Sequence, residues 1–191
     1  NSAGAELILN SVAKTDNSFS TIIKLINEGK IKALYVVEED IAAISEEANK
    51  ALDKLEVLIV HSSNQNNTVE KANIVFPSST FAEKNGTYVN SNGRVQRIKP
   101  AVTTAEMDRS LDNMELSRLD KFGTDFDRWG KVEKISARPT WKIFLGLANA
   151  VGNKMKYQMS EDIFIEMAKN LPQFAGLNYE LIGEKGENIK K

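Results

Sequence analysis

The chain has 191 residues, of which 41% are hydrophobic and 27% are charged, values typical of a globular protein with a sizeable core. The 25 basic and 26 acidic residues give a formal charge of -1, so no basic excess favours nucleic acid or an anionic membrane surface. No apolar run approaches the roughly 20 residues that a membrane-spanning helix needs. The composition therefore predicts neither nucleic-acid binding nor direct membrane insertion.

Cysteine is absent from the chain, and histidine occurs once, as His61. Thiolates ligate iron–sulfur clusters and, together with histidine, structural zinc. We therefore expect no metal site, no catalytic residue and no redox centre in this chain. The opening residues Asn1 to Gly4 include no methionine and no signal-peptide pattern, which indicates a processed chain or a piece of a longer one.

Apolar residues at helical spacing predict a first helix from Phe19 to Ile26, with Ser18 as its N-cap and Gly29 as its end. The same spacing predicts one further helix over residues 41–55, preceded by Asp40 as its cap.

Three short apolar runs rich in β-branched residues predict buried strands over residues 33–37, 57–60 and 74–76. A turn of helix is expected near Thr68, before the third strand. Strands buried on both faces and joined by helices are typical of a parallel sheet. The predicted fold class is α/β: a partial doubly wound, Rossmann-like sheet, with more strands expected upstream or in a partner.

The pattern changes after Pro77. Asn92-Gly93 lies between two β-favouring runs, residues 87–90 and 94–98, and predicts a hairpin, because Asn-Gly tolerates positive φ. Residues 103–138 are charged and weakly periodic, which favours short helices and ordered loops.

Two better helices are predicted near the C-terminus. The first begins at Pro139 and ends at Gly152, and the second is capped by Ser160. Their inward faces are predicted to be Trp141, Phe144, Leu145, Ala148 and Val151 in the first, and Ile163, Phe164, Met167, Ala168 and Leu171 in the second. The chain is thus divided into an α/β part, residues 1–102, and a mostly helical appendage, residues 103–191.

Polar residues follow the first two predicted strands. His61 ends the second strand, where α/β sheets bind ligands, so it is either a general base or a hydrogen-bonded loop residue. Glu38, Glu39 and Asp40 end the first strand. They could hold a hard cation, or they could serve as a helix cap with two glutamates near the helix N-terminus.

The predicted hairpin offers a second candidate site. Arg94 could bind a phosphate bidentately or pair with a carboxylate such as that of Glu83. Neither of the glycine-rich phosphate loops, GxGxxG or GxxxxGK[ST], occurs in the sequence.

Two segments carry a family resemblance. Residues 29–37 read GKIKALYVV, and residues 72–97 read ANIVFPSSTFAEKNGTYVNSNGRVQR. The second resembles the passage A-D-V-V-L-P … E-x-x-G-T-x-x-N-x-x-G-R-x-Q of molybdopterin oxidoreductases. The motifs TFAEKxGT and NxxGRVQR within it are most similar to the large iron–sulfur subunit of NADH:quinone oxidoreductase, respiratory complex I.

The chain departs from the family pattern at the end of the first strand. Glu38 stands where the family usually has glycine, and Asp40-Ile41 stands where it often has Asn-Pro. His61-Ser62 replaces the usual aspartate after the second strand. In molybdenum members the turn after the first strand, where this chain has Glu38, lies beside the pterin dinucleotide. We therefore expect a cleft flanked by Glu38, His61 and residues 77–80, whose carboxylates repel nucleotides.

The resemblance implies a structural and docking part of the complex I subunit, without its own cofactor and inactive in isolation. Its iron–sulfur clusters would lie upstream, its partners would be other subunits of the respiratory NADH dehydrogenase, and it would be cytoplasmic and peripheral to the inner membrane. The alternative is a domain of a molybdenum or tungsten bis-pterin oxidoreductase, of formate dehydrogenase or nitrate reductase type. A third possibility is a stand-alone binding module. Under the alternative, the resemblance implies these molybdopterin-binding residues: Glu38, His61, Thr80, Glu83, Gly86, Thr87, Asn90, Gly93, Arg94 and Gln96.

Overall fold

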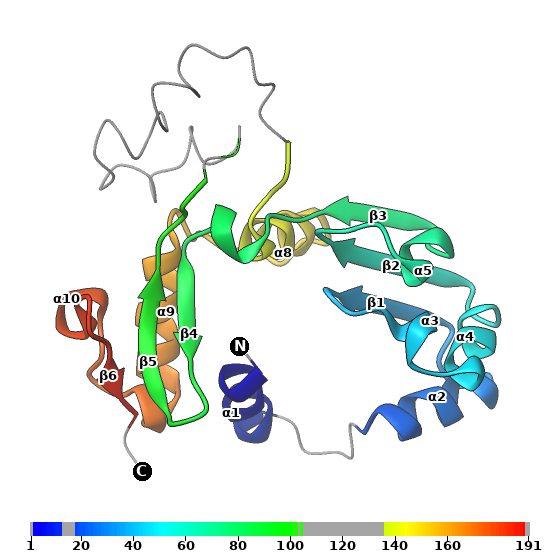
Figure 1. Cartoon of the computed structure of the whole chain (residues 1–191), viewed down its shortest axis with the longest axis horizontal. Helices are drawn as coiled ribbons and strands as arrows, with labels where there is room; N and C mark the ends of the chain where they lie inside the picture. The colour runs from blue at the N-terminus through cyan, green and yellow to red at the C-terminus, as the bar shows by residue number, and fades with distance from the viewer. Residues whose placement is uncertain (1, 13–17, 103, 105–135, 190–191) are drawn as a thin grey trace. The chain divides into compact units, whose positions relative to one another are not determined.

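A computed structural model describes residues 2–12, 18–102, 104 and 136–189 (Figure 1). The chain forms two compact units, one of residues 14–78 and one that combines residues 1–13 with residues 79–191. The predicted division at residue 102 stays a prediction. Most of the weakly periodic segment 103–138 lies outside the described residues. Among those residues, no helix has the length and apolar character needed to cross a bilayer.

The parallel unit, as we call residues 14–78, contains a three-stranded parallel sheet in the order β1-β2-β3. The α/β fold class predicted from the sequence is confirmed. Its elements are α2 (Phe19–Asn27), β1 (Ala33–Val37), α3 (Ile41–Ile44), α4 (Glu46–Leu52), β2 (Val57–Ser62), α5 (Asn67–Glu70) and β3 (Ile74–Pro77).

The helices of the parallel unit cover one face of its sheet (Figure 1). Alternate strand residues share a face, and the register pairs Leu34 with Leu58 and Val36 with Val60. These side chains pack with residues of α3, α4 and α5, while a second cluster joins α2 to α4. Burial of this face holds the strand ends, and the loops that leave them, in place.

The prediction of a single helix over residues 41–55 is wrong. Ser45 is fully extended, with φ -159° and ψ 157°, and it separates α3 from α4. Its hydroxyl accepts a hydrogen bond from the backbone N–H of Ala48. The N-cap interaction of Ser45 therefore competes with helix continuation and starts a new helix.

The second unit, which we call the hairpin unit, contains an antiparallel sheet in the order β4-β5-β6. The hairpin predicted around Asn92-Gly93 is confirmed, and Gly93 has φ +76°. The described elements are α1 (Ser2–Val12), η1 (Phe81–Glu83), β4 (Gly86–Val89), β5 (Arg94–Ile98), α8 (Thr140–Ala150), α9 (Ser160–Asn170), η4 (Pro172–Phe174), α10 (Tyr179–Ile182) and β6 (Glu187–Asn188).

The core of the hairpin unit forms where α9 packs against β4 and β5. Phe164 is 1% exposed, and its ring stacks on Tyr179 with centroids 5.3 Å apart. The inward face predicted for α9 is correct in Phe164 and Leu171. For α8 it is wrong in part. Phe144 is 43% exposed and Val151, just after the helix, is 81% exposed, whereas Ile143, which was not predicted, is buried.

Candidate functional site

The carboxyl ends of the three parallel strands lie side by side, because Val37, His61 and Phe76 are in register. The residues that follow the strands are polar. Glu38 follows β1, Ser63 follows β2 and Ser78 follows β3. The structure thus brings Glu38 and His61 together at one sheet edge, as the sequence predicted.

Glu38 has a left-handed backbone, with φ +57°, and no other non-glycine residue in the described part of the chain has positive φ. Its N–H donates to the carbonyl oxygen of His61 at 2.8 Å. A side chain in this conformation costs about 1–2 kcal/mol relative to a right-handed one. Glycine avoids that cost, which is the physical reason why glycine suits this turn in the family that the sequence resembles.

The Glu38 carboxylate receives hydrogen bonds from two different loops. Its Oε2 accepts from the backbone N–H of Ser63 at 3.2 Å and from the Ser63 hydroxyl at 2.9 Å. Its Oε1 accepts from the hydroxyl of Ser78. We call these three donors the serine cradle. Three donors around two oxygens of one anion fit an oxyanion, so this edge can hold a phosphate or carboxylate group.

His61 is fully buried, at 0% exposure. Its Nδ1 lies 3.5 Å from the Tyr35 hydroxyl, and the two rings meet edge to face with centroids 6.4 Å apart. Burial raises the pKa of the Tyr35 hydroxyl, which keeps it protonated at neutral pH. These contacts describe a packed, hydrogen-bonded histidine; the general-base role stays a prediction.

Asp40 differs from its predicted role. It occupies the N-cap position of α3, but its side chain makes no cap hydrogen bond there. Instead, Oδ1 accepts from the Thr68 hydroxyl at 2.7 Å and from the Thr68 N–H at 3.0 Å. The hydrogen bond from the Thr68 hydroxyl is the main reason why the pKa of Asp40 lies below its ordinary value. Sequence reasoning assigned Asp40 to its own helix because the contact with Thr68 is tertiary.

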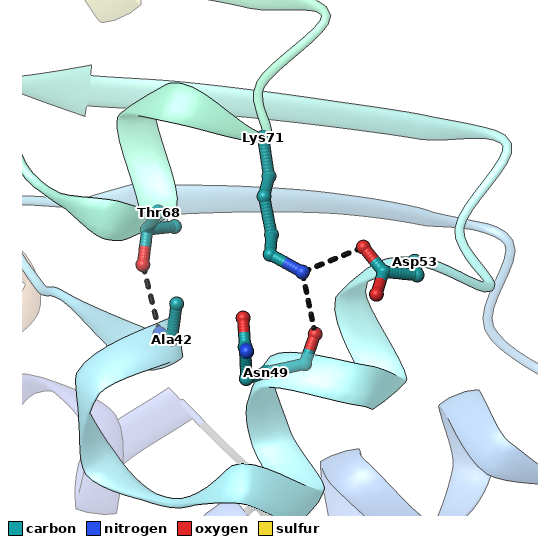
Figure 2. Close-up of polar contacts among 5 residues, drawn as sticks. All are labelled: Ala42, Asn49, Asp53, Thr68 and Lys71. Atoms are coloured by element: carbon teal, nitrogen blue, oxygen red, sulfur yellow. Dashed lines mark hydrogen bonds and ion pairs between the residues drawn. The ribbon is translucent and has the colours of Figure 1, made fainter.

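Thr68 in turn fixes α3 against α5. Its hydroxyl accepts from the N–H of Ala42 at 2.9 Å, as Figure 2 shows. In the same view, the ammonium of Lys71 donates to the carbonyl of Asn49 at 3.1 Å and pairs with Asp53 at 2.6 Å. These contacts tie the helices behind the sheet edge to one another.

Glu38 and Asp40 therefore bind different partners, and their predicted cation-binding role stays a prediction. Among the described residues, no three histidine, cysteine, aspartate or glutamate side chains gather in a way that could hold a metal.

The remaining predicted site residues belong to the hairpin unit. Glu83 Oε2 accepts from the N–H of Thr80 at 2.8 Å and from its hydroxyl at 3.0 Å, which closes a capping box. Arg94 does not pair with Glu83: its Nη1 donates to the carbonyl of Lys185 at 2.7 Å.

Polar groups at the tip of the hairpin bind one another. Asn90 Oδ1 accepts from the N–H groups of Asn92 and Arg94, at 3.0 and 2.9 Å. Thr87 shares a hydrogen bond with the Tyr179 hydroxyl at 2.9 Å. Gly86 begins β4 opposite Ile98, and Gln96 lies opposite Tyr88. Thr87, Asn90 and Arg94 thus have structural contacts, and their cofactor roles stay predictions.

Among the hollows in the described part of the hairpin unit, two differ in size and lining. The smaller, of about 190 Å³, has an apolar lining that includes Trp141, Ile163 and Phe164. The larger, of about 480 Å³, is lined in part by Asn90 and Gln96, both predicted site residues. The cleft predicted beside Glu38 and His61 stays a prediction.

Sequence reasoning missed Ser63 as a site residue and included Ser78 only as part of a turn. The available signal was position, because each serine lies just after a buried parallel strand. Their convergence on Glu38 could not be foreseen, since it depends on the left-handed backbone of a residue that rarely adopts it.

The comparisons with known proteins point to one family. The family model described as "Molybdopterin oxidoreductase" matches residues 1–111. The chain is 32% identical over 162 residues to "F420-dependent formate dehydrogenase 2 subunit alpha" of Methanococcus maripaludis, a match that covers 82% of the chain and 20% of that protein. It is 30% identical over 164 residues to "Putative formate dehydrogenase YrhE" of Bacillus subtilis, covering 84% of the chain and 14% of that protein.

These relatives are much longer than the chain, which spans 14–20% of their length. Their names favour the formate dehydrogenase alternative over the complex I subunit that the wording of residues 72–97 suggested. The family match covers the parallel sheet, the serine cradle and the hairpin. The chain belongs to the molybdopterin oxidoreductase family.

Proposed function

We propose that this chain is part of a molybdenum or tungsten bis-pterin oxidoreductase of formate dehydrogenase type. Within that enzyme it would bind the nucleotide end of the pterin cofactor. The names of its relatives support the reaction class. The observation that carries the proposal is the serine cradle, an oxyanion-binding arrangement at the carboxyl edge of a parallel sheet. Ligands of open α/β sheets bind at this edge.

The cofactor would supply the two-electron chemistry, and this chain would bind and orient it. Ser63 and Ser78 would hold a phosphate oxygen of the pterin dinucleotide through the donors that now hold Glu38. Iron–sulfur clusters would reside elsewhere in the protein, because this chain has no cysteine.

The test is made on the full protein that contains this chain. Purified from cells supplied with molybdate or tungstate, it should contain molybdenum or tungsten and should reduce an artificial acceptor with formate. Metal analysis by mass spectrometry and a formate-dependent dye assay give the two readings. A protein without either metal, inert towards formate and purifying with NADH dehydrogenase subunits, would return the assignment to complex I.

The matched variant is Ser63→Ala with Ser78→Ala, which removes both hydroxyl donors of the serine cradle. Metal content should fall in this variant if the cradle holds the cofactor. Thr21→Ala, which removes a partly exposed hydroxyl on α2, serves as the control and should leave metal content unchanged.

A further inference from the structure

We propose that Glu38 is an internal occupant of an oxyanion site: its carboxylate fills the serine cradle and closes it to phosphate from solution. The proposal relies on the proposed function only for the natural ligand, a phosphate-bearing cofactor. The site itself follows from the contacts of Glu38, Ser63 and Ser78.

The first argument is geometric. Glu38 leaves the end of β1, yet its carboxylate bonds to the residue after β2 and to the residue after β3. One side chain therefore links the carboxyl ends of all three parallel strands. Both carboxylate oxygens are used, and a phosphate placed on the same donors would accept the same hydrogen bonds.

The second argument concerns solvent. Glu38 is an exposed residue, and water alone would solvate its carboxylate. Ser78 is only 3% exposed, so its hydroxyl needs an acceptor within the protein. The carboxylate reaches in from the surface to Ser78, and an external anion could use the same approach.

The third argument is the backbone. The left-handed conformation of Glu38 is unfavourable for glutamate and neutral for glycine. The hydrogen bond from its N–H to His61 fixes the turn in this form. Replacing Glu38 by glycine should therefore preserve the turn and empty the cradle without disturbing the sheet.

Charge then decides which anion binds. A phosphate cannot share the donors with an ionised carboxylate, because like charges a few ångströms apart repel. Glu38 and a phosphate thus compete for Ser63 and Ser78. The chain excludes weak anions such as free phosphate, and only a ligand anchored by further contacts displaces the carboxylate.

The experiment uses the full protein made in cells that cannot synthesise the pterin, so that no cofactor occupies the serine cradle. The protein is purified without phosphate, and pyrophosphate is the probe. Calorimetry and the shift of the melting midpoint measure binding to the wild type and to Glu38→Gly. The variant should bind pyrophosphate about ten-fold more tightly or better, and should keep its melting midpoint in the absence of the probe. Glu39→Gln, which alters the neighbouring exposed carboxylate, should bind as the wild type does.

Two results would overturn the proposal. One is wild-type protein that binds pyrophosphate as tightly as Glu38→Gly. The other is a gain in affinity for pyrophosphate that persists in the triple variant Glu38→Gly, Ser63→Ala, Ser78→Ala, since the anion would then bind elsewhere. Glu38→Gln, which keeps the size of the side chain, must show part of the gain even if the glycine variant is unstable. These outcomes are independent of the metal content and formate activity that test the proposed function.

Discussion

Gly186 has no room for a side chain. It has φ +75°, and a Cβ there would lie 2.5 Å from the carbonyl oxygen of Val95 and 2.6 Å from Cγ of Gln96. Gly186→Ala should lower the free energy of unfolding by about 2 kcal/mol or more, from the strained conformation and the overlap together. Urea denaturation monitored by circular dichroism measures it.

The control is Gly146→Ala in the middle of α8, where an added Cβ meets nothing within 4 Å. Alanine is the better helix former, so this variant should gain roughly 0.5–1 kcal/mol. Opposite signs at the two glycines are expected; equal effects would contradict the close approach at Gly186.

Thr68 is a fully buried hydroxyl with two partners. It donates to Asp40 and accepts from the N–H of Ala42. Thr68→Val keeps the shape and removes both bonds, leaving that N–H buried without its acceptor, at a cost of about 1–3 kcal/mol in unfolding free energy. Thr68→Ser keeps the hydroxyl and should lose less. Equal losses in both variants would show that the methyl group, and not the hydroxyl, matters.

The same contact makes stability depend on pH. The Thr68 hydroxyl lowers the pKa of Asp40 below its ordinary value of 3.8. A depressed pKa adds stability that is present above the ordinary value and is lost as pH falls through the folded-state pKa. The advantage of the wild type over Thr68→Val should therefore be constant from neutral pH to about pH 5 and shrink below 3.8. Denaturation midpoints across this range measure it, and an advantage unchanged at the lowest pH would refute the link to Asp40.

At the scale of elements, local signals predicted most of the fold. β1 has the predicted bounds, Ala33 to Val37, and Gly93 lies at positive φ in the predicted hairpin. Both depend on residues close in sequence. The break at Ser45 was also a local signal, but the apolar stripe that continues past it outweighed the serine.

The other errors share a tertiary cause. Asp40 binds Thr68, twenty-eight positions along the chain, instead of its own helix. The buried side of α8 is set by its neighbours, which cover Ile143 and leave Phe144 43% exposed. The serine cradle has the same origin, because it joins three loops that meet only in the folded sheet. Periodicity predicts whether a segment is a helix or a strand. Contacts between elements decide which of its residues are buried and which partners its polar side chains bind.

The β4–β5 hairpin offers a test at this scale. A Cβ on Gly93 would lie 3.1 Å from Cγ1 of Ile189 in addition to adopting φ +76°. Gly93→Val should lower the free energy of unfolding by roughly 1 kcal/mol or more. Gly93→Asn should lose less, since asparagine tolerates this conformation. Calorimetric melting measures both, and an unchanged midpoint for the valine variant would contradict the turn.

At the scale of the whole molecule, β3 ends the parallel sheet in the described part of the chain and exposes apolar side chains. Ile74 is 46% exposed and Val75 is 43% exposed. Edge strands of this kind are normally covered or charged. Because the relatives are five to seven times longer than the matched segment, we expect further chain of the same protein to cover β3.

Ile74→Lys tests this expectation in two contexts. In the 191-residue chain it should raise solubility and change the melting midpoint little, because the side chain is half exposed. In the full protein it should lower the midpoint by several degrees, because the charge would be buried. The same small effect in both contexts would show that β3 is an exposed edge in the full protein too.

The division of the chain has a consequence for protein synthesis. The parallel unit is continuous in sequence, so its sheet can form as soon as residues 14–78 have left the ribosome. The hairpin unit is discontinuous: α1 belongs with β4, which is translated only after the whole parallel unit. Because α1 precedes β4 in the sequence, α1 emerges before its partner strand and must wait for it. A pause in translation after residue 78 has left the ribosome would let the parallel unit fold while the apolar side of α1 stays open to chaperones.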